Sequence, residues 1–231
     1  MKTLVIIPTI NVEDTILQVI EDLNFNASQI DYLVVDYGST DRTIALLDNN
    51  KIPYLSMPIS SKYKHALNVG MRYAKEQAYD GIIEYDGQNL YEAKYIHQLL
   101  IRAKKCDLVL GSRFLNKNHK RKKKFICKVV SWSIKLTTKK VVTDPTMRYR
   151  YYRIKVVKPL LEDKYWKSGP DAIAFLIASG YSFDELSMEL RYNPKNKHYS
   201  QSTELPRKRL AQGLKWIMSI IFVQPFRKRG T

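Results

Sequence analysis

The chain has 231 residues, of which 45% are apolar, 26% are charged and 11% are aromatic. This composition excludes a disordered chain, and the length suits one α/β domain with a C-terminal appendage. The 39 Lys and Arg residues against 22 Asp and Glu residues give a net charge of +17. Such a charge favours polyanionic partners: nucleic acid, anionic lipid head groups or phosphorylated substrates.

Two features bear on the cellular compartment. The cysteines, Cys106 and Cys127, lack metal-ligand spacing and require no oxidising environment. The apolar stretch at residues 4–8 is too short for a signal-peptide core, and no run approaches the ~20 apolar residues that span a bilayer. We therefore expect a cytoplasmic protein.

Short β-branched runs alternate with helical patterns in the first half of the chain. Strands are predicted at residues 4–8, 33–36, 52–57, 81–85 and 108–111, and helices at residues 13–23, 40–49, 65–77 and 95–104. This alternation predicts an α/β fold with a mainly parallel sheet flanked by helices. Ligands of such sheets bind at the carboxyl ends of the strands. We therefore expect the functional site just after the residues that end four of the strands: Pro8, Asp36, Tyr85 and Gly111.

The pattern changes after Arg113. Residues 116–124 are polar and basic, and residues 125–138 are predicted to form an amphipathic helix. Further along we expect a strand within residues 144–153, a helix at 171–179, a loop at 192–202 and a helix at 205–226. The chain thus divides into a domain at 1–203, with a basic and amphipathic insertion at 115–140, and a C-terminal amphipathic helix at 204–231.

The segment Asp-Tyr-Gly-Ser-Thr-Asp, at residues 36–41, follows the second predicted strand. A carboxylate at the end of this strand, Asp36, can accept hydrogen bonds from the base or ribose of a nucleotide. Gly38 permits a tight turn, and Ser39 or Thr40 can cap the next helix. The alternative is an ordinary strand–turn–helix junction without a ligand.

The segment Glu-Tyr-Asp-Gly-Gln, at residues 84–88, follows the fourth predicted strand. Glu84 and Asp86 are two residues apart at a strand end and so point to the same side. The pair suits a hard divalent cation, Mg²⁺ or Mn²⁺, that also takes diphosphate oxygens as ligands and offsets the charge on a leaving nucleoside diphosphate. Two acids in a turn without a metal are the alternative.

Four segments in order resemble the family 2 glycosyltransferases of the GT-A fold. Residues 6–13 resemble the family's Pro-Ala-Tyr-Asn-Glu-Glu start, and residues 36–41 its Asp-Asp-Gly-Ser-x-Asp segment. Residues 84–88 resemble its Asp-x-Asp-Gly-Gln metal motif, and residues 107–114 its Asp-Val-Val-x-Gly-Ser-Arg-Phe segment. The likeness covers residues 3–195.

The polyprenyl-phosphate glycosyltransferases, which include dolichol-phosphate-mannose synthase, are the most similar branch. Residues 143–150 lie where that branch has Asp-x-x-Ser-Gly-Phe-Arg, and residues 180–188 resemble its Gly-Tyr-x-x-x-Glu-x-Pro-Val segment. The sequence departs from the pattern where Tyr37 and Glu84 replace acids and where Met147 and Arg148 replace Ser-Gly. The expected Arg-x-x-Gly-x-Ser near residue 200 is absent.

The resemblance implies an inverting enzyme that moves a hexose or N-acetylhexosamine from a nucleotide-sugar, preferably UDP-linked, to an undecaprenyl or dolichyl phosphate for cell-envelope glycan assembly. The alternative is a soluble family 2 glycosyltransferase acting on a glycan or protein hydroxyl, which requires a general base. Nucleic acid is not the expected partner, because acids at two strand ends repel its phosphates unless a metal intervenes. A sugar-nucleotide pyrophosphorylase would need a Gly-rich loop after the first strand, which Pro-Thr-Ile-Asn is not.

The resemblance also assigns the site. Donor binding is expected of Pro8, Thr9, Glu13, Asp36, Lys64, Glu84, Tyr85, Asp86, Gln88 and Arg113, and metal binding of Asp86 and Glu84. Catalytic roles are expected of Asp86, Arg113, Asp144, Arg150 and Asp171. Asp171, or else Asp144, would be the base for a hydroxyl acceptor, and Arg150 serves either a phosphate or the fold. The acceptor phosphate is assigned to Arg121, Lys124 and Lys128.

Basic residues 120–124 precede the amphipathic helix at 125–138. Each Lys or Arg near an anionic membrane contributes about 1 kcal/mol, and the apolar faces of residues 125–138 and 214–223 add buried area at the lipid interface. We therefore expect a peripheral protein on the inner face of the cell membrane. The alternatives are that these helices pack on the domain, or that the C-terminal helix binds a small membrane protein.

Overall fold

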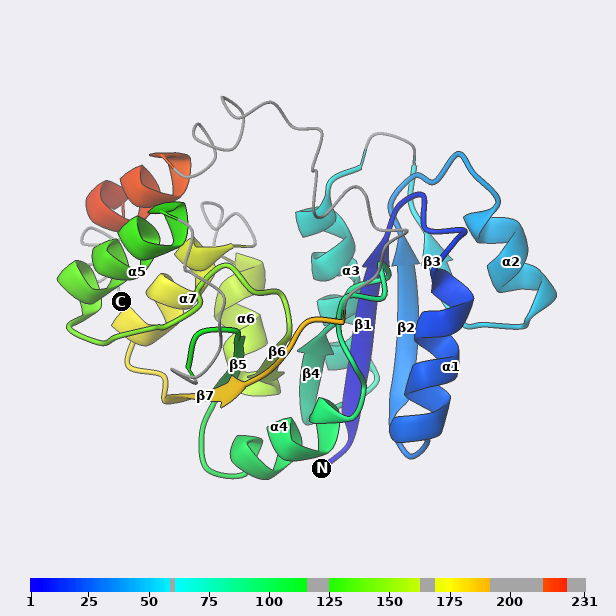
Figure 1. Cartoon of the computed structure of the whole chain (residues 1–231), viewed down its shortest axis with the longest axis horizontal. Coiled ribbons are helices and arrows are strands. Elements are labelled where there is room, and N and C mark those ends of the chain that lie inside the picture. The colour runs from blue at the N-terminus through cyan, green and yellow to red at the C-terminus, as the bar shows by residue number, and fades with distance from the viewer. Residues whose placement is uncertain (59–60, 116–124, 163–168, 192–213, 224–231) are drawn as a thin grey trace.

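One mixed sheet organises the molecule. The structure, a computed structural model, describes residues 1–58, 61–115, 125–162, 169–191 and 214–223. In sheet order the strands are β3 (Tyr54–Ser56), β2 (Asp31–Asp36), β1 (Thr3–Thr9), β4 (Gly81–Glu84), β6 (Arg150–Arg153), β5 (Leu108–Ser112) and β7 (Phe183–Ser187) (Figure 1). Neighbouring strands are parallel except on both sides of β6, which runs antiparallel to β4 and β5. The expected α/β fold with a mainly parallel sheet is confirmed.

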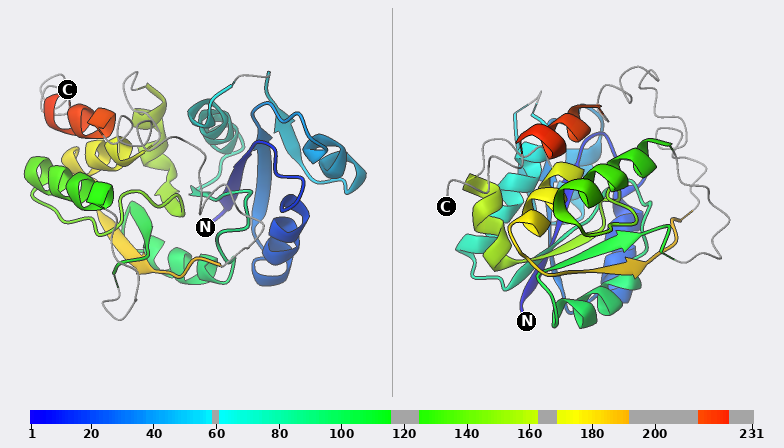
Figure 2. Two further views of the ribbon diagram at one scale, coloured as in Figure 1. Left: turned by 45° about the horizontal axis from the view of Figure 1, so that its top comes forward. Right: turned by 90° about the vertical axis from the view of Figure 1, so that its left-hand side faces the viewer.

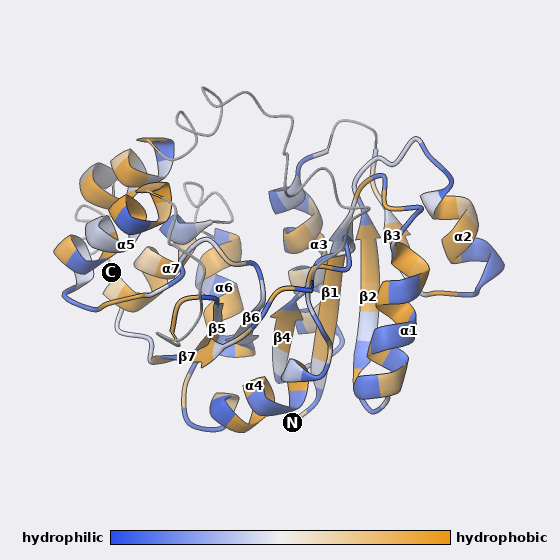
Figure 3. Ribbon diagram, in the orientation of Figure 1, coloured by the Kyte–Doolittle hydropathy of each residue, from blue (hydrophilic) through white to orange (hydrophobic). Residues whose placement is uncertain are grey.

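Helices cover both faces of the sheet. On one face lie α1 (Ile16–Asn26), α2 (Thr43–Asn49) and α4 (Tyr95–Ala103). On the other lie α3 (Tyr63–Glu76) and α6 (Ile154–Glu162). Figure 3 shows β1 and β2 apolar over most of their length, as expected for strands buried on both faces. Successive side chains of β1 point to opposite faces of the sheet. Val5 and Ile7 therefore pack against α1, α2 and α4, whereas Leu4 and Ile6 pack against α3 and α6.

A third apolar cluster lies beyond β5, where three helical elements meet: α5 (Phe125–Thr138), α7 (Pro170–Ala178) and the π-helical turn η1 (Ser219–Val223) (Figure 2). Val130 and Ile134 of α5 are buried there together with Ile220 of η1. The inner face of α5 therefore packs on the domain, one of the two roles that the sequence left open. No helix in the described ranges has the length and apolar character needed to cross a membrane.

The five strands predicted in the first half are confirmed with small shifts of their ends, and the strand expected within residues 144–153 is β6. The sequence did not predict α6 or β7. Helix α6 begins directly after β6 and contains Pro159, so neither a linker nor a helical composition marks it. Strand β7 is a half-buried edge strand of polar composition, which lacks the apolar run of its neighbours.

The loop predicted at residues 192–202 and the basic stretch at 116–124 lie outside the described residues. The C-terminal helix is observed over residues 214–223, of which the last five form η1.

Candidate active site

The first two motifs meet at the carboxyl edge of the sheet. Strands β1 and β2 are in parallel register with Thr9 opposite Asp36, and Tyr37 N donates to Thr9 O at 3.0 Å. On the other side of β1, Tyr85 N donates to Ile6 O at 3.0 Å. The end of β4 therefore lies beside the ends of β1 and β2, as the parallel sheet predicts.

Asp36 stabilises the turn that follows β2. Its carboxylate accepts hydrogen bonds from the N–H groups of Gly38 and Ser39, both at 3.0 Å, and from the Ser39 hydroxyl. Gly38 has φ +113°, a left-handed conformation that favours glycine. The Asp36 carboxylate is buried, so its contacts in this structure are those of the strand–turn–helix junction.

The loop after β1 is attached to the same turn. Asn11 N donates to Ser39 Oγ at 2.9 Å, and Thr40 N donates to Asn11 Oδ1 at 2.8 Å. The Glu13 carboxylate accepts from Arg42 N at 2.9 Å and from Arg42 Nε at 3.1 Å. Glu13, predicted to bind the donor, thus holds the start of α2.

Glu84 is fully buried and belongs to a hydrogen-bonded network. Its two oxygens accept hydrogen bonds from Tyr63 Oη at 2.6 Å and Tyr152 Oη at 3.0 Å. The Arg150 guanidinium lies 3.6 Å from the same carboxylate and donates to the carbonyls of Met147 and Pro145. Burial alone would lower the pKa of Arg150, but Tyr152 and Glu84 outweigh it and raise that pKa. Of the two roles left open for Arg150, the structure supports the one in the fold.

Asp86 has a different environment from Glu84. It is half-buried just beyond β4, and its Oδ1 accepts a hydrogen bond from Gln88 N at 2.7 Å. Among the described residues Oδ2 accepts none. Burial raises the pKa of Asp86 to about 6, although the Gln88 N–H and the charge of Arg148 act in the opposite direction. Asp86 is therefore the better candidate metal ligand of the two acids.

No three acidic, His or Cys side chains of the described ranges lie close enough together to hold a metal ion by themselves. The donor set at this edge fits an ion that is held by one carboxylate and completed by phosphate oxygens and water. Mg²⁺ and related hard cations are commonly bound in this way beside nucleotide phosphates.

Arg113 and Asp144 form a bidentate ion pair at the end of β5. Arg113 Nε and Nη2 donate to the two Asp144 oxygens at 2.6 and 2.9 Å, and Nη2 also donates to Thr146 Oγ1 at 2.9 Å. Burial would raise the pKa of Asp144, but the hydrogen bonds and charge of Arg113 outweigh it and hold that pKa below its usual range. Asp144 is therefore a weak candidate for a general base.

Tyr85 does not lie where the donor was expected. It is fully buried on the opposite face of the sheet from Glu84, and its hydroxyl donates to Tyr91 O at 3.0 Å. Its ring packs against the rings of Tyr91 and Tyr149. One step along a strand changes the face, so Glu84 and Tyr85 cannot share a ligand.

The remaining predicted residues are spread over the fold. Pro8 and Thr9 are buried at the end of β1, and no described residue hydrogen-bonds to Thr9 Oγ1. Lys64 lies in the first turn of α3, and Gln88 follows Asp86. Asp171 is buried in the first turn of α7, whereas Lys128 is exposed on α5. Arg121 and Lys124 lie outside the described residues.

Sequence reasoning missed a cluster beside Asp86. The Arg148 guanidinium lies 4.1 Å from the centre of the Tyr63 ring, and the Tyr37 and Tyr63 rings meet edge-on with centroids 6.2 Å apart. Tyr37 and Arg148 were visible only as two separate departures from the family pattern. In the structure both residues contact the ring of Tyr63.

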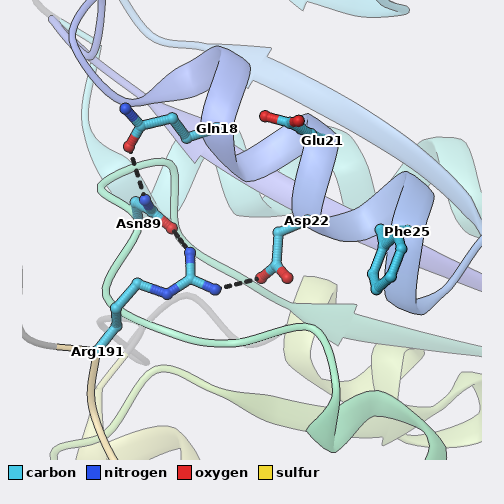
Figure 4. A pocket seen from close by; sticks show the side chains of 6 residues that line it. All are labelled: Gln18, Glu21, Asp22, Phe25, Asn89 and Arg191. Carbon is cyan, nitrogen blue, oxygen red and sulfur yellow. Dashed lines mark hydrogen bonds and ion pairs between the residues drawn. The ribbon is translucent and has the colours of Figure 1, made fainter.

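Two cavities of the described residues lie elsewhere. One, of about 340 Å³, is lined by Gln18, Glu21, Asp22, Phe25, Asn89 and Arg191. Figure 4 shows the Arg191 guanidinium between Asn89 and Asp22, and its Nη2 lies 3.0 Å from Asp22. A second, of about 460 Å³, lies beside Met1 and Arg153. Neither is lined by Asp86 or Arg113.

Comparisons with known proteins agree with this arrangement. An undecaprenyl-phosphate mannosyltransferase from Micrococcus luteus is 27% identical over 169 residues, which cover 69% of this chain and 70% of the relative. A polyprenol monophosphomannose synthase from Mycolicibacterium smegmatis is 24% identical over 170 residues, which cover 69% of this chain and 64% of the relative. Both fall in the polyprenyl-phosphate branch that the motifs indicate.

Solved structures show the same fold. The glucosyl-3-phosphoglycerate synthase of Mycobacterium tuberculosis, crystallised with Mn²⁺, uridine-diphosphate-glucose and phosphoglyceric acid, has a TM-score of 0.65 and 14% identity, covering 95% of this chain and 79% of that one. Its complex with uridine-diphosphate has a TM-score of 0.64 and 15% identity, covering 95% and 80%. The GT-A fold is thereby confirmed. The family model described as Glycosyl transferase family 2 matches residues 4–160, more than half of the sequence, and the chain therefore belongs to that family.

Proposed function

We propose that this protein is an inverting, metal-dependent glycosyltransferase that moves a hexose or N-acetylhexosamine from a nucleotide-sugar to a polyprenyl phosphate. The observation that carries the proposal is Asp86, a half-buried carboxylate just beyond the central strand β4 with one oxygen not engaged by the described residues. The names of the two curated relatives support a polyprenyl-phosphate acceptor. The uridine-diphosphate-glucose bound in a protein of similar fold supports a UDP-linked donor.

Asp86 would hold Mg²⁺ or Mn²⁺ together with oxygens of the donor diphosphate. When bound, the ion would offset the charge that develops on the leaving nucleoside diphosphate. The protein's part is to fix Asp86: the N–H of Gln88 orients one carboxylate oxygen. Glu84 supports the site indirectly, because it accepts the hydrogen bonds that hold the side chains of Tyr63 and Tyr152 in place.

An acceptor phosphate needs positioning more than deprotonation. The second pKa of a phosphomonoester is about 6, so the acceptor is mostly ionised near neutral pH. A hydroxyl acceptor would instead require a base, and the ion pair with Arg113 keeps Asp144 ionised and engaged. This observation favours the phosphate acceptor over the hydroxyl acceptor, for which Asp171 stays the candidate base.

We further propose that the enzyme works at the inner face of the cell membrane. On α5 the side chains of Phe125, Trp132 and Leu136 are exposed, and Lys128 and Lys135 are exposed on the same helix. Aromatic residues with neighbouring lysines suit the interface of an anionic bilayer. A small membrane protein bound through the C-terminal helix is the alternative.

The test supplies the purified protein with short-chain polyprenyl phosphate, Mn²⁺ or Mg²⁺, and a panel of UDP- and GDP-linked sugars. We expect lipid-linked sugar with one donor, loss of product on chelation of divalent ions, and loss of at least about 100-fold in kcat in Asp86→Ala. Asp14→Asn, at an exposed acid, is the matched control and should keep activity. Transfer only to water-soluble hydroxyl acceptors would reject the lipid acceptor, and full activity of Asp86→Ala would reject the metal assignment.

A further inference from the structure

Arg148 is an exposed cation beside the candidate metal ligand. It lies in the segment that leads into β6, and its backbone N–H donates to Tyr91 Oη at 3.3 Å. Arg113 and Arg150 are engaged with Asp144 and Glu84, but the Arg148 side chain makes no hydrogen bond or ion pair with the described residues. Its guanidinium donors are therefore available to a ligand.

The ring of Tyr63 forms a fixed platform for this guanidinium. Arg148 Cζ lies 4.1 Å from the ring centre, a cation–π distance. The ring itself is held at two points: its hydroxyl donates to buried Glu84 at 2.6 Å, and it packs against the Tyr37 ring at an interplanar angle of 84°. Stacking on a fixed ring orients a guanidinium while leaving its N–H groups exposed at the edge.

The position of Arg148 relative to Asp86 follows from the sheet. Strands β4 and β6 are antiparallel with Glu84 opposite Arg150, and Asp86 and Arg148 lie two positions beyond this pair at the same end of the two strands. Tyr63 also connects the two segments, because its hydroxyl donates to Glu84 and its ring carries the Arg148 guanidinium. A phosphate that completes the coordination of an ion on Asp86 would lie near this guanidinium.

We propose that Arg148 is a phosphate-binding residue of the active site, seated on Tyr63 and donating two parallel hydrogen bonds to a phosphate group next to Asp86. The inference rests on the proposed function, because it assumes that phosphates are bound at this edge of the sheet. An arginine suits the role since its planar fork matches phosphate oxygens in a bidentate manner. The phosphate belongs either to the donor diphosphate or to the lipid acceptor, and the experiment separates these sources.

The experiment compares Arg148→Ala and Arg148→Lys with Arg72→Ala, which removes an exposed arginine from α3 and so controls for net charge. Calorimetry measures binding of UDP and of GDP in the presence of Mn²⁺, without turnover. Steady-state assays then measure KM for the donor and for short-chain polyprenyl phosphate. Thermal unfolding of each variant reports folding, which we expect to be unchanged because the side chain is exposed.

We expect Arg148→Ala to weaken one phosphate ligand by about 10-fold to 100-fold, the size of a charged hydrogen bond, and Arg148→Lys to recover only part of this loss. Weaker nucleotide binding assigns the donor diphosphate, whereas a raised acceptor KM with normal nucleotide binding assigns the acceptor phosphate. Normal values for all ligands in Arg148→Ala would overturn the inference. So would a loss that Arg72→Ala shares, or a full recovery in Arg148→Lys.

The measurement of nucleotide binding separates a failure of the proposed function from a failure of the inference about Arg148. If the wild-type chain binds nucleotide with Mn²⁺ but transfers no sugar to polyprenyl phosphate, the proposed acceptor fails while Arg148 is still tested by nucleotide binding. If the wild-type chain turns over and Arg148→Ala equals Arg72→Ala, only the inference about Arg148 fails.

Discussion

Arg113 at the end of β5 donates to both carboxylate oxygens of Asp144 at 2.6 and 2.9 Å, so that the strand end is tied to the segment before β6. Asp144 is completely buried, and the Arg113 side chain is 15% exposed. The pair thus fixes the glycosyltransferase motif at residues 107–114 against the segment that carries Arg148. Loss of this ion pair should lower the stability of the protein and also change the geometry of the candidate active site.

Asp144→Asn should destabilise the protein by about 3 kcal/mol at pH 7, because it leaves the Arg113 guanidinium without its counter-charge in a mostly buried place. The effect depends on pH. The folded pKa of Asp144 is below its unfolded value of about 3.9, so the native chain binds fewer protons and the stabilisation is complete above that pH. It is lost as pH falls through the folded pKa.

Urea unfolding at pH 7, 4 and 3 measures this contribution. The difference between wild type and Asp144→Asn should shrink below about pH 4, while Asp14→Asn, at an exposed acid, should match wild type throughout. A difference that stays constant down to pH 3 would contradict the ion-pair explanation.

Glu84→Gln should lower the free energy of unfolding by about 3–5 kcal/mol, since it removes the counter-charge of buried Arg150. It should leave Mn²⁺ affinity in the presence of nucleotide within about threefold, because Glu84 already contacts protein groups through both oxygens. Tyr152→Phe is the matched control: it deletes two hydrogen bonds of the same network, one to Glu84 and one from Arg150, and should cost about 1.5–3 kcal/mol. A folded Glu84→Gln protein that loses the metal would restore Glu84 as a ligand.

The order of the motifs along the sheet was predictable, because parallel strands bring their carboxyl ends to one edge regardless of loop details. The partners of each acid were not. Glu84 and Asp86 differ only by two positions in sequence, yet Glu84 meets two tyrosines and an arginine that the chain supplies from α3 and β6. Contacts between segments that are distant in the sequence decide which acid is buried and has its hydrogen-bonding groups paired. No local sequence pattern contains that information.

Faces of strands were harder to assign than their positions. The motif at residues 84–88 predicts a donor contact for Tyr85, but strand alternation places this residue in the core with Tyr91 and Tyr149. In the sequence, Arg148 differs from its surroundings only in replacing the glycine of the family pattern. Its importance depends on Tyr63, which lies 85 positions earlier in the chain and which no motif marks.

Gly111 in the same motif as Arg113 is required by packing. A methyl group there would lie 2.6 Å from Met188 Sδ and 2.9 Å from the carbonyl oxygen of Tyr149, and the backbone oxygen cannot move aside without breaking β5–β6 pairing. Gly111→Ala should therefore cost about 1–3 kcal/mol in denaturant unfolding. Gly180→Ala is the contrasting variant: nothing lies within 4 Å, so its smaller cost of about 1 kcal/mol comes from φ +88° alone. Equal costs at the two positions would contradict the steric account.

The exposed face of α5 gives the last prediction, a membrane attachment with both apolar and ionic parts. Phe125 and Trp132 are 76% and 56% exposed, and a double change of both to Ser should weaken binding to vesicles of anionic lipid by at least about tenfold, since burial of each ring contributes about 1.5–3 kcal/mol. Phe25→Ser is the matched control, because Phe25 is 85% exposed on α1, away from this surface.

Co-sedimentation with vesicles at increasing salt tests the ionic part. Wild-type binding should weaken between 0.05 and 0.5 M salt, concentrations over which screening shortens the reach of lysine charges to about 4 Å. The double Ser variant should lose the salt-insensitive remainder, whereas Phe25→Ser should follow wild type. Equal losses of vesicle binding in the double Ser variant and in Phe25→Ser would mean that any exposed aromatic side chain contributes, whatever its position. The α5 surface would then no longer be the attachment site.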